Sequence, residues 1–130
     1  MPNDPMAVAV VDDDNDVRSA LSRLLRAMGY QVKVFRSAEE FEAEPVGVDC
    51  VIADVRLPGL SGVELHERLR HRIVPTPVVL ITGDSDRLAR DIAGAVDTPV
   101  VTKPFDAVAL TAAIADAIAR AGAIREKHAR

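Results

Sequence analysis

The sequence contains few aromatic residues and few lysines. Aromatic side chains make up 3% of its 130 residues, with three Phe, one Tyr and no Trp, so stacking platforms for single-stranded nucleic acids are not expected. Three residues are Lys, and the formal net charge is −4. General nucleic-acid and membrane-surface binders carry a basic footprint, and we expect neither activity from this chain.

Cysteine is almost absent as well. The single Cys50 has no partner for a disulfide within the chain, and it opens an apolar stretch, which favours a small buried hydrophobe over a redox thiol. No signal-peptide pattern and no apolar run of transmembrane length occur in the sequence. We therefore expect a protein of the reducing cytoplasm, with no membrane contact.

Short aliphatic runs alternate with amphipathic stretches of helical length. The 48% hydrophobic content suffices for one buried core. The Val-rich and Ile-rich runs predict strands buried on both faces at residues 7–11, 31–35, 50–53, 77–81 and 99–101. Pro99 fits such a sheet only if the last strand lies at its edge.

Helices are expected between the strands, the first over residues 15–28 with Gly29 as its stop. The pairs Ser37 with Glu40 and Ser61 with Glu64 predict capping boxes. The residues expected to cap the last two helices are Ser85 and Asp106.

This alternation predicts an α/β fold with a five-stranded parallel sheet and helices on both faces. The common flavodoxin-like order is 2-1-3-4-5, with a switch point between the first and third strands. We expect residues 1–121 to form this domain. Residues 122–130 are expected to be a charged C-terminal tail or the start of a linker.

Polar residues stop four of these apolar runs: Asp12 and Asp13, Asp54, Thr82, and Lys103. The carboxyl ends of parallel strands meet at one sheet edge, where ligands bind. Three carboxylates around one hole suit a hard cation such as Mg²⁺, which offsets their mutual repulsion. A hydroxyl and an ammonium group opposite the metal suit an incoming phosphoryl group, for which Asp54 is the candidate nucleophile.

The segments VVDDD, VIADVRLPGLSG, VVLITG and TKPF occur in this order. Through them, over about residues 7–119, the chain resembles the receiver domain of bacterial two-component response regulators, especially the nitrogen-fixation and nitrate-response type. The resemblance implies that Asp54 accepts a phosphoryl group from a sensor histidine kinase or phosphotransfer protein. It also implies Mg²⁺ bound directly by Asp13 and Asp54, by Asp12 largely through water, and by the backbone carbonyl of Arg56.

The resemblance gives two further residues a role at the phosphoryl group. Thr82 reorients to hold one phosphoryl oxygen, and Lys103 pairs with another. The resemblance implies a domain that is not a classical enzyme, because it catalyses only its own phosphorylation and dephosphorylation, and it makes a homodimer on phosphorylation a possible partner state of this chain. No segment resembles a helix-turn-helix, so DNA contact by this domain is not expected.

One departure from the family pattern keeps an alternative open. Receivers commonly carry Tyr or Phe three residues before the lysine, where this chain has Val100. A receiver-like binding module that signals without phosphate is therefore the alternative function. A haloacid-dehalogenase-type phosphatase with Asp12 as its nucleophile is disfavoured, because Asp16 stands where that motif needs a β-branched residue.

Three side chains outside the acidic group also receive an interpretation. His66 and His71 are expected at the surface and not as metal ligands. Arg56 is also expected to face Asp84 at the mouth of the site, where the pair would restrict an attacking water.

Overall fold

The computed structural model describes residues 6–44, 47–83, 87, 91 and 94–129, with side chains up to residue 123. Five parallel strands form one sheet in the order β2-β1-β3-β4-β5, which confirms the predicted topology. The strands are β1 (Ala7–Val11), β2 (Gln31–Phe35), β3 (Cys50–Asp54), β4 (Val78–Thr82) and β5 (Val100–Thr102). Each begins and ends within one residue of its predicted range.

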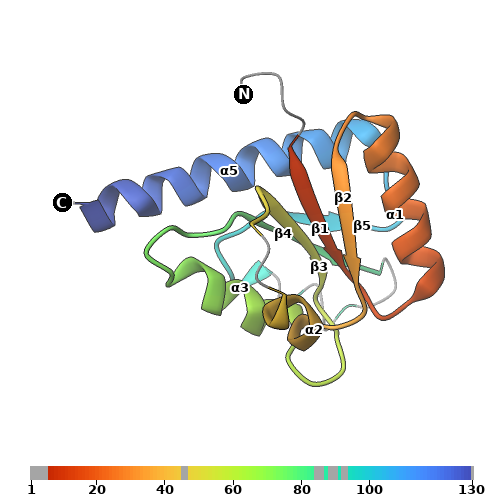
Figure 1. Ribbon diagram of the computed structural model, residues 1–130, viewed down its shortest axis with the longest axis horizontal. Coiled ribbons are helices and arrows are strands. Elements are labelled where there is room, and N and C mark those ends of the chain that lie inside the picture. The colour runs from red at the N-terminus through yellow and green to blue at the C-terminus, as the bar shows by residue number, and fades with distance from the viewer. Residues whose placement is uncertain (1–5, 45–46, 84–86, 88–90, 92–93, 130) are drawn as a thin grey trace.

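The described helices cover both faces of the sheet (Figure 1). They are α1 (Asn15–Ala27), α2 (Ala38–Ala43), α3 (Gly62–Arg70) and α5 (Ala107–Ala129). Helices α1 and α5 pack on one face, and α2 and α3 pack on the other. Helix α1 ends as predicted, because Gly29 adopts a left-handed conformation with φ of 97°.

The helix caps follow the predictions with one difference. Ser61 and Glu64 form a complete capping box at the start of α3. Ser37 accepts a hydrogen bond from the Glu40 N–H at 3.0 Å, but the Glu40 carboxylate accepts from the N–H of Arg36 instead of closing the box. The predicted cap Ser85 lies outside the described residues.

Two apolar clusters form the core, one on each face of the sheet. Under α2 and α3, Phe35 and Phe41 make an edge-to-face contact with ring centroids 5.4 Å apart. The other cluster joins Leu21 of α1 to Leu110 of α5. It includes Cys50, which is fully buried as expected, and burial raises the pKa of its thiol to about 12.

The two edge strands depart from the expectation of strands buried on both faces. Strand β4, in the interior of the sheet, is buried throughout, whereas most residues of β2 are exposed or half-buried. Pro99 immediately precedes the edge strand β5, where a missing N–H is tolerated.

Helix α5 continues without a break through residue 121 to Ala129 and extends past the sheet in Figure 1. Residues 122–129 are therefore helical where a tail or linker was expected. That a linker begins in this region stays a prediction. In the described part of the chain, no helix combines the length and apolar character needed to cross a membrane.

His66, within α3, and His71, at the C-terminal end of this helix, lie in different environments. The side chain of His71 is 67% exposed, and its Nε2 lies 2.7 Å from Glu67 Oε1. His66 was expected at the surface, and that expectation was wrong, because it is only 6% exposed. Its position on the inward face of α3, toward the segment before β5, explains the burial.

Candidate functional site

The register of the sheet brings the polar strand ends together. Val11 lies beside Ala53 in the pairing of β1 with β3, so Asp12 and Asp54 follow at the same level. Thr82 lies beside Thr102 in the pairing of β4 with β5, and the Lys103 N–H donates to the Thr82 carbonyl at 2.9 Å. The acidic and basic residues named from the sequence therefore meet around the switch point of the sheet.

Asp12 is an acidic residue in an unfavourable environment. Its carboxylate is fully buried, with Oδ1 accepting the Asp14 N–H at 2.9 Å. The other oxygen, Oδ2, is buried without a hydrogen-bond partner among the described residues. Burial raises the pKa of Asp12 to about 6, the Asp14 N–H opposes this shift, and the neighbouring charge of Asp54 adds to it.

Asp54 lies between a cation and a backbone donor. The Lys103 Nζ is 3.4 Å from Asp54 Oδ2, and the Arg56 N–H donates to Asp54 Oδ1 at 2.8 Å. The Asp54 side chain is 14% exposed, which leaves it reachable from solvent. Thr82, at the end of β4, is buried, and among the described residues its hydroxyl makes only a long 3.5 Å contact with the Gly83 carbonyl.

The two other predicted magnesium ligands lie at exposed positions. Asp13 is exposed, and the residue after it, Asp14, is the N-cap of α1, accepting from the Asp16 and Val17 N–H groups. Arg56 is exposed too, and its proposed partner Asp84 lies outside the described residues. Among the residues that the structure describes, no three His, Cys, Asp or Glu side chains converge into a metal cage.

The acidic residues nevertheless fit a magnesium ion. Mg²⁺ keeps several waters and takes only one or two protein carboxylates, so a closed cage is not its usual site. The unpartnered Oδ2 of Asp12 lies beside a second negative charge, that of Asp54. A cation at this edge would satisfy that oxygen and relieve the repulsion.

Two contacts hold the loop between β3 and α3 against the site. A Cβ on Gly62 would lie 2.0 Å from the carbonyl oxygen of Asp54, so this close approach requires glycine. At the loop's other side, the Glu39 carboxylate of α2 accepts the Leu60 N–H at 3.0 Å. This hydrogen bond lowers the pKa of Glu39.

Sequence reasoning missed two residues around the site. Glu39 was hidden because its partner is a backbone N–H 21 positions away. Arg18 was also missed, although its Nη1 donates to the carbonyl of Asp12 at 2.7 Å. Their only sequence signal is a charge near a helix N-terminus, which more often marks a solvated helix surface than a site.

Comparison with known proteins gives a consistent family relationship. Residues 8–115 match the family model described as the response regulator receiver domain. The chain is 40% identical over 119 residues to the transcriptional regulatory protein FixJ of Bradyrhizobium diazoefficiens, covering 88% of this chain and 57% of that protein. It is 36% identical over 123 residues to the response regulator protein TmoT of Ectopseudomonas mendocina, covering 91% and 55%.

Solved structures agree with this relationship. The crystal structure of FixJ-N superposes with a TM-score of 0.74 at 32% identity, covering 88% of this chain and 94% of that one. A response regulator receiver protein from Burkholderia phymatum gives a TM-score of 0.72 at 36% identity, with 88% and 95% covered. The chain spans little more than half the length of the curated relatives that it matches.

Proposed function

The chain belongs to the response regulator receiver family of two-component systems, and from this we propose that Asp54 is its phosphoacceptor. The observation that carries the proposal is the position of Asp54 at the end of β3, partly exposed and 3.4 Å from Lys103. A carboxylate held beside a fixed ammonium group has the surroundings that phosphoryl transfer requires, because transfer is catalysed mainly by positioning and charge neutralisation.

In the proposed reaction, an Asp54 carboxylate oxygen attacks the phosphorus of a phosphohistidine on a kinase or phosphotransfer protein. A P–O bond forms, the P–N bond breaks, and its electron pair leaves with the imidazole nitrogen, so Asp54 becomes an acyl phosphate. Lys103 pairs with one phosphoryl oxygen, and the buried hydroxyl of Thr82 donates to another after it turns from the Gly83 carbonyl.

We propose that Asp13 and Asp54 bind Mg²⁺ directly, with Asp12 acting largely through water and the Arg56 carbonyl completing the protein ligands. When bound, the ion supplies neutralisation of charge on the phosphoryl oxygens. The chain's own contribution is to hold the acceptor still: the Arg56 N–H fixes one Asp54 oxygen, and the close packing of Gly62 fixes the carbonyl of Asp54.

The partners are part of this proposal: a sensor histidine kinase or phosphotransfer protein as donor, and a second copy or an output domain as receiver of the signal. The names of the relatives, a transcriptional regulatory protein and a response regulator, support an output in gene regulation outside this domain. A phosphate-independent module is the second candidate, because Val100, partly exposed on β5, stands where the family's aromatic switch is expected.

Intact-mass spectrometry tests the acceptor directly. With acetyl phosphate and Mg²⁺, the wild-type chain should gain the mass of one phosphoryl group, and Asp54→Asn should gain none. Asp49→Asn is the matched control, because Asp49 precedes the other end of the same strand, where its carboxylate accepts the Ala7 N–H. Equal modification of Asp54→Asn would contradict the assignment, and an unmodified wild type would favour the phosphate-independent module.

A further inference from the structure

A hollow of about 650 Å³ lies between α1 and the edge strand β2, and it adjoins the acidic site at Arg18, which donates to the Asp12 carbonyl. In the described part of the chain, its lining includes Arg18, Arg23 and Arg26 but no Asp or Glu. None of Asp12, Asp54, Thr82 or Lys103 lines it, so the proposed phosphorylation does not account for this surface. A volume of this size lies within the range of about 300–1,000 Å³ that is typical of small-molecule sites.

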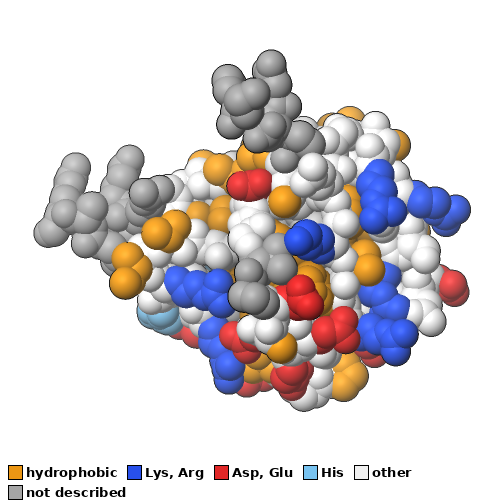
Figure 2. All heavy atoms as spheres, in the orientation of Figure 1, with side chains coloured by type: hydrophobic (Ala, Val, Ile, Leu, Met, Phe, Trp, Pro, Cys, Tyr) orange, Lys and Arg blue, Asp and Glu red, His pale blue; other side chains and the backbone are white. Residues whose placement is uncertain are grey.

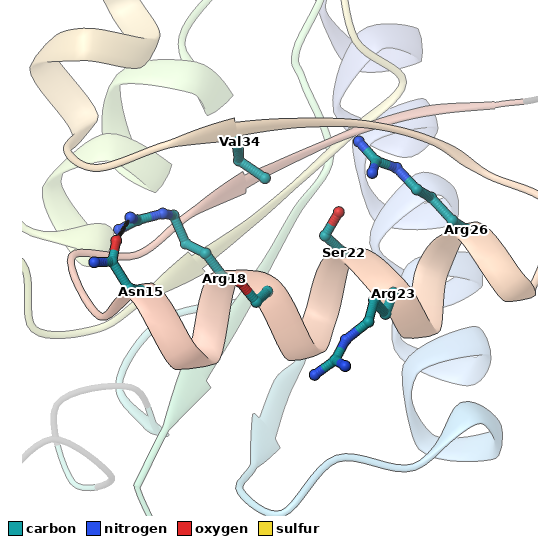
Figure 3. Close-up of a pocket in the computed structure, with 7 residues that line it drawn as sticks. Asn15, Arg18, Ser22, Arg23, Arg26 and Val34 are labelled. Atoms are coloured by element: carbon teal, nitrogen blue, oxygen red, sulfur yellow. Dashed lines mark hydrogen bonds between the residues drawn. The ribbon is translucent and has the colours of Figure 1, made fainter.

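Two of the arginines are oriented by hydrogen bonds to the protein. Arg18 donates to the Asp12 carbonyl at 2.7 Å and to the side chain of Asn15, and Arg26 donates to the Val32 carbonyl at 3.4 Å. Figure 3 shows the Arg18 guanidinium turned toward Asn15 at one end of the hollow and Arg26 reaching toward β2 at the other, whereas Arg23 points away from Val34. A guanidinium has five donors, so each of these groups keeps donors for a ligand.

Ser22 adds a hydroxyl group to the lining of the hollow. It is only 7% exposed. Figure 3 shows this hydroxyl directed into the hollow, between the two arginines and opposite Val34. A ligand oxygen in the hollow would accept a hydrogen bond from this hydroxyl.

The surface charge and shape define the ligand. The whole chain is acidic, with a net charge of −4, yet Lys and Arg side chains gather in Figure 2 on the side where Figure 1 shows α1 and β2. Arg18 and Arg26 are eight residues apart, which is about 12 Å along a helix. Val34 adds an apolar surface, because it is 45% exposed. A compact inorganic ion would not reach across these groups.

We propose that the hollow between α1 and β2 binds an elongated organic phosphate of nucleoside-diphosphate size. Its phosphate groups accept hydrogen bonds from Arg26 and the Ser22 hydroxyl, and its other end lies over Val34 toward Arg18. Arginine suits this role because its planar donors match phosphate oxygens in pairs.

The test is a titration of isotope-labelled protein with ADP in magnesium-free buffer, followed by amide NMR shifts. We expect saturable shifts in α1 and β2, with binding weakened at least about tenfold in Arg26→Gln and in Ser22→Ala. Arg72→Gln removes an equal charge from an exposed position after α3 and should bind like the wild type. The amide spectra also show whether each variant is folded.

Four results would overturn the proposal. The first is the absence of saturable shifts up to about 10 mM ADP, a concentration that still reveals weak complexes. The second is equal weakening by Arg72→Gln, which would indicate general charge attraction. The third is wild-type affinity in Ser22→Ala. A parallel titration with inorganic phosphate should bind more weakly than ADP, and equal affinity would overturn the assignment to an elongated organic ligand.

Discussion

At the scale of single residues, Asp12 has a carboxylate that the fold alone does not stabilise. One of its oxygens is buried without a partner in the described part of the chain, and Asp54 adds a like charge nearby. A buried polar atom left without a hydrogen bond is destabilising by about 1–3 kcal/mol. Asp12 therefore contributes little to folding by itself, which agrees with the proposed role of its carboxylate in binding a cation.

His66 gives a prediction on pH. Burial lowers its pKa below the ordinary 6.5, with Arg70 adding to the shift and Glu67 and Asp97 opposing it. The unfolded chain therefore takes up a proton first as the pH falls below 6.5, so stability is lost on acidification in this window. Urea unfolding at pH 7.5 and 5.5 should show a larger loss in wild type than in His66→Gln.

The effect of His66 is separated from that of other groups by comparing the pH dependence of the two proteins. Asp12 titrates near the same range with the opposite sign, because its raised pKa favours the folded state on acidification, but it is present in both proteins. An unchanged dependence in His66→Gln would show that other groups cause it.

At the scale of elements, the loop between β3 and α3 is fixed by a close backbone approach. Gly62→Ala places a Cβ 2.0 Å from the Asp54 carbonyl oxygen, a backbone atom that has little freedom to move. We expect a loss of at least about 2 kcal/mol in the free energy of unfolding. Gly122→Ala, in open space on α5, should instead stabilise by about 0.5–1 kcal/mol. Urea unfolding of both variants checks this contrast.

Glu39 gives a second prediction for the same loop, which also carries the Arg56 carbonyl. Losing its hydrogen bond to the Leu60 N–H in Glu39→Ala should loosen the loop and slow phosphorylation by acetyl phosphate several-fold. Glu39→Gln keeps an oxygen that accepts the same N–H and should recover most of the rate. Glu44→Gln, at an exposed position after α2, is the control. If Ala and Gln variants behave alike, the hydrogen bond does not position the loop.

At the scale of the whole molecule, the alternation of short aliphatic runs with amphipathic stretches was enough to predict the topology of the sheet. Strand ends are readable because each apolar run stops at a polar residue, as at Asp12 and Lys103. The packing between segments that are distant in the sequence could not be predicted from it. The burial of His66 depends on the segment before β5, and the exposure of Val34 depends on how far α1 covers the edge strand. Such features follow from the assembled layers and have no local pattern.

The burial of Cys50 means that the protein carries its own reporter of transient opening. Its sulfur lies inside the layer shared by α1, α5 and the sheet, and its raised pKa keeps it protonated. A disulfide dye reacts with the thiolate form, so labelling should wait for global opening and speed up as urea is added. Time courses of dye release measure this rate. Labelling as fast as that of a free thiol in native buffer would mean that this layer opens locally.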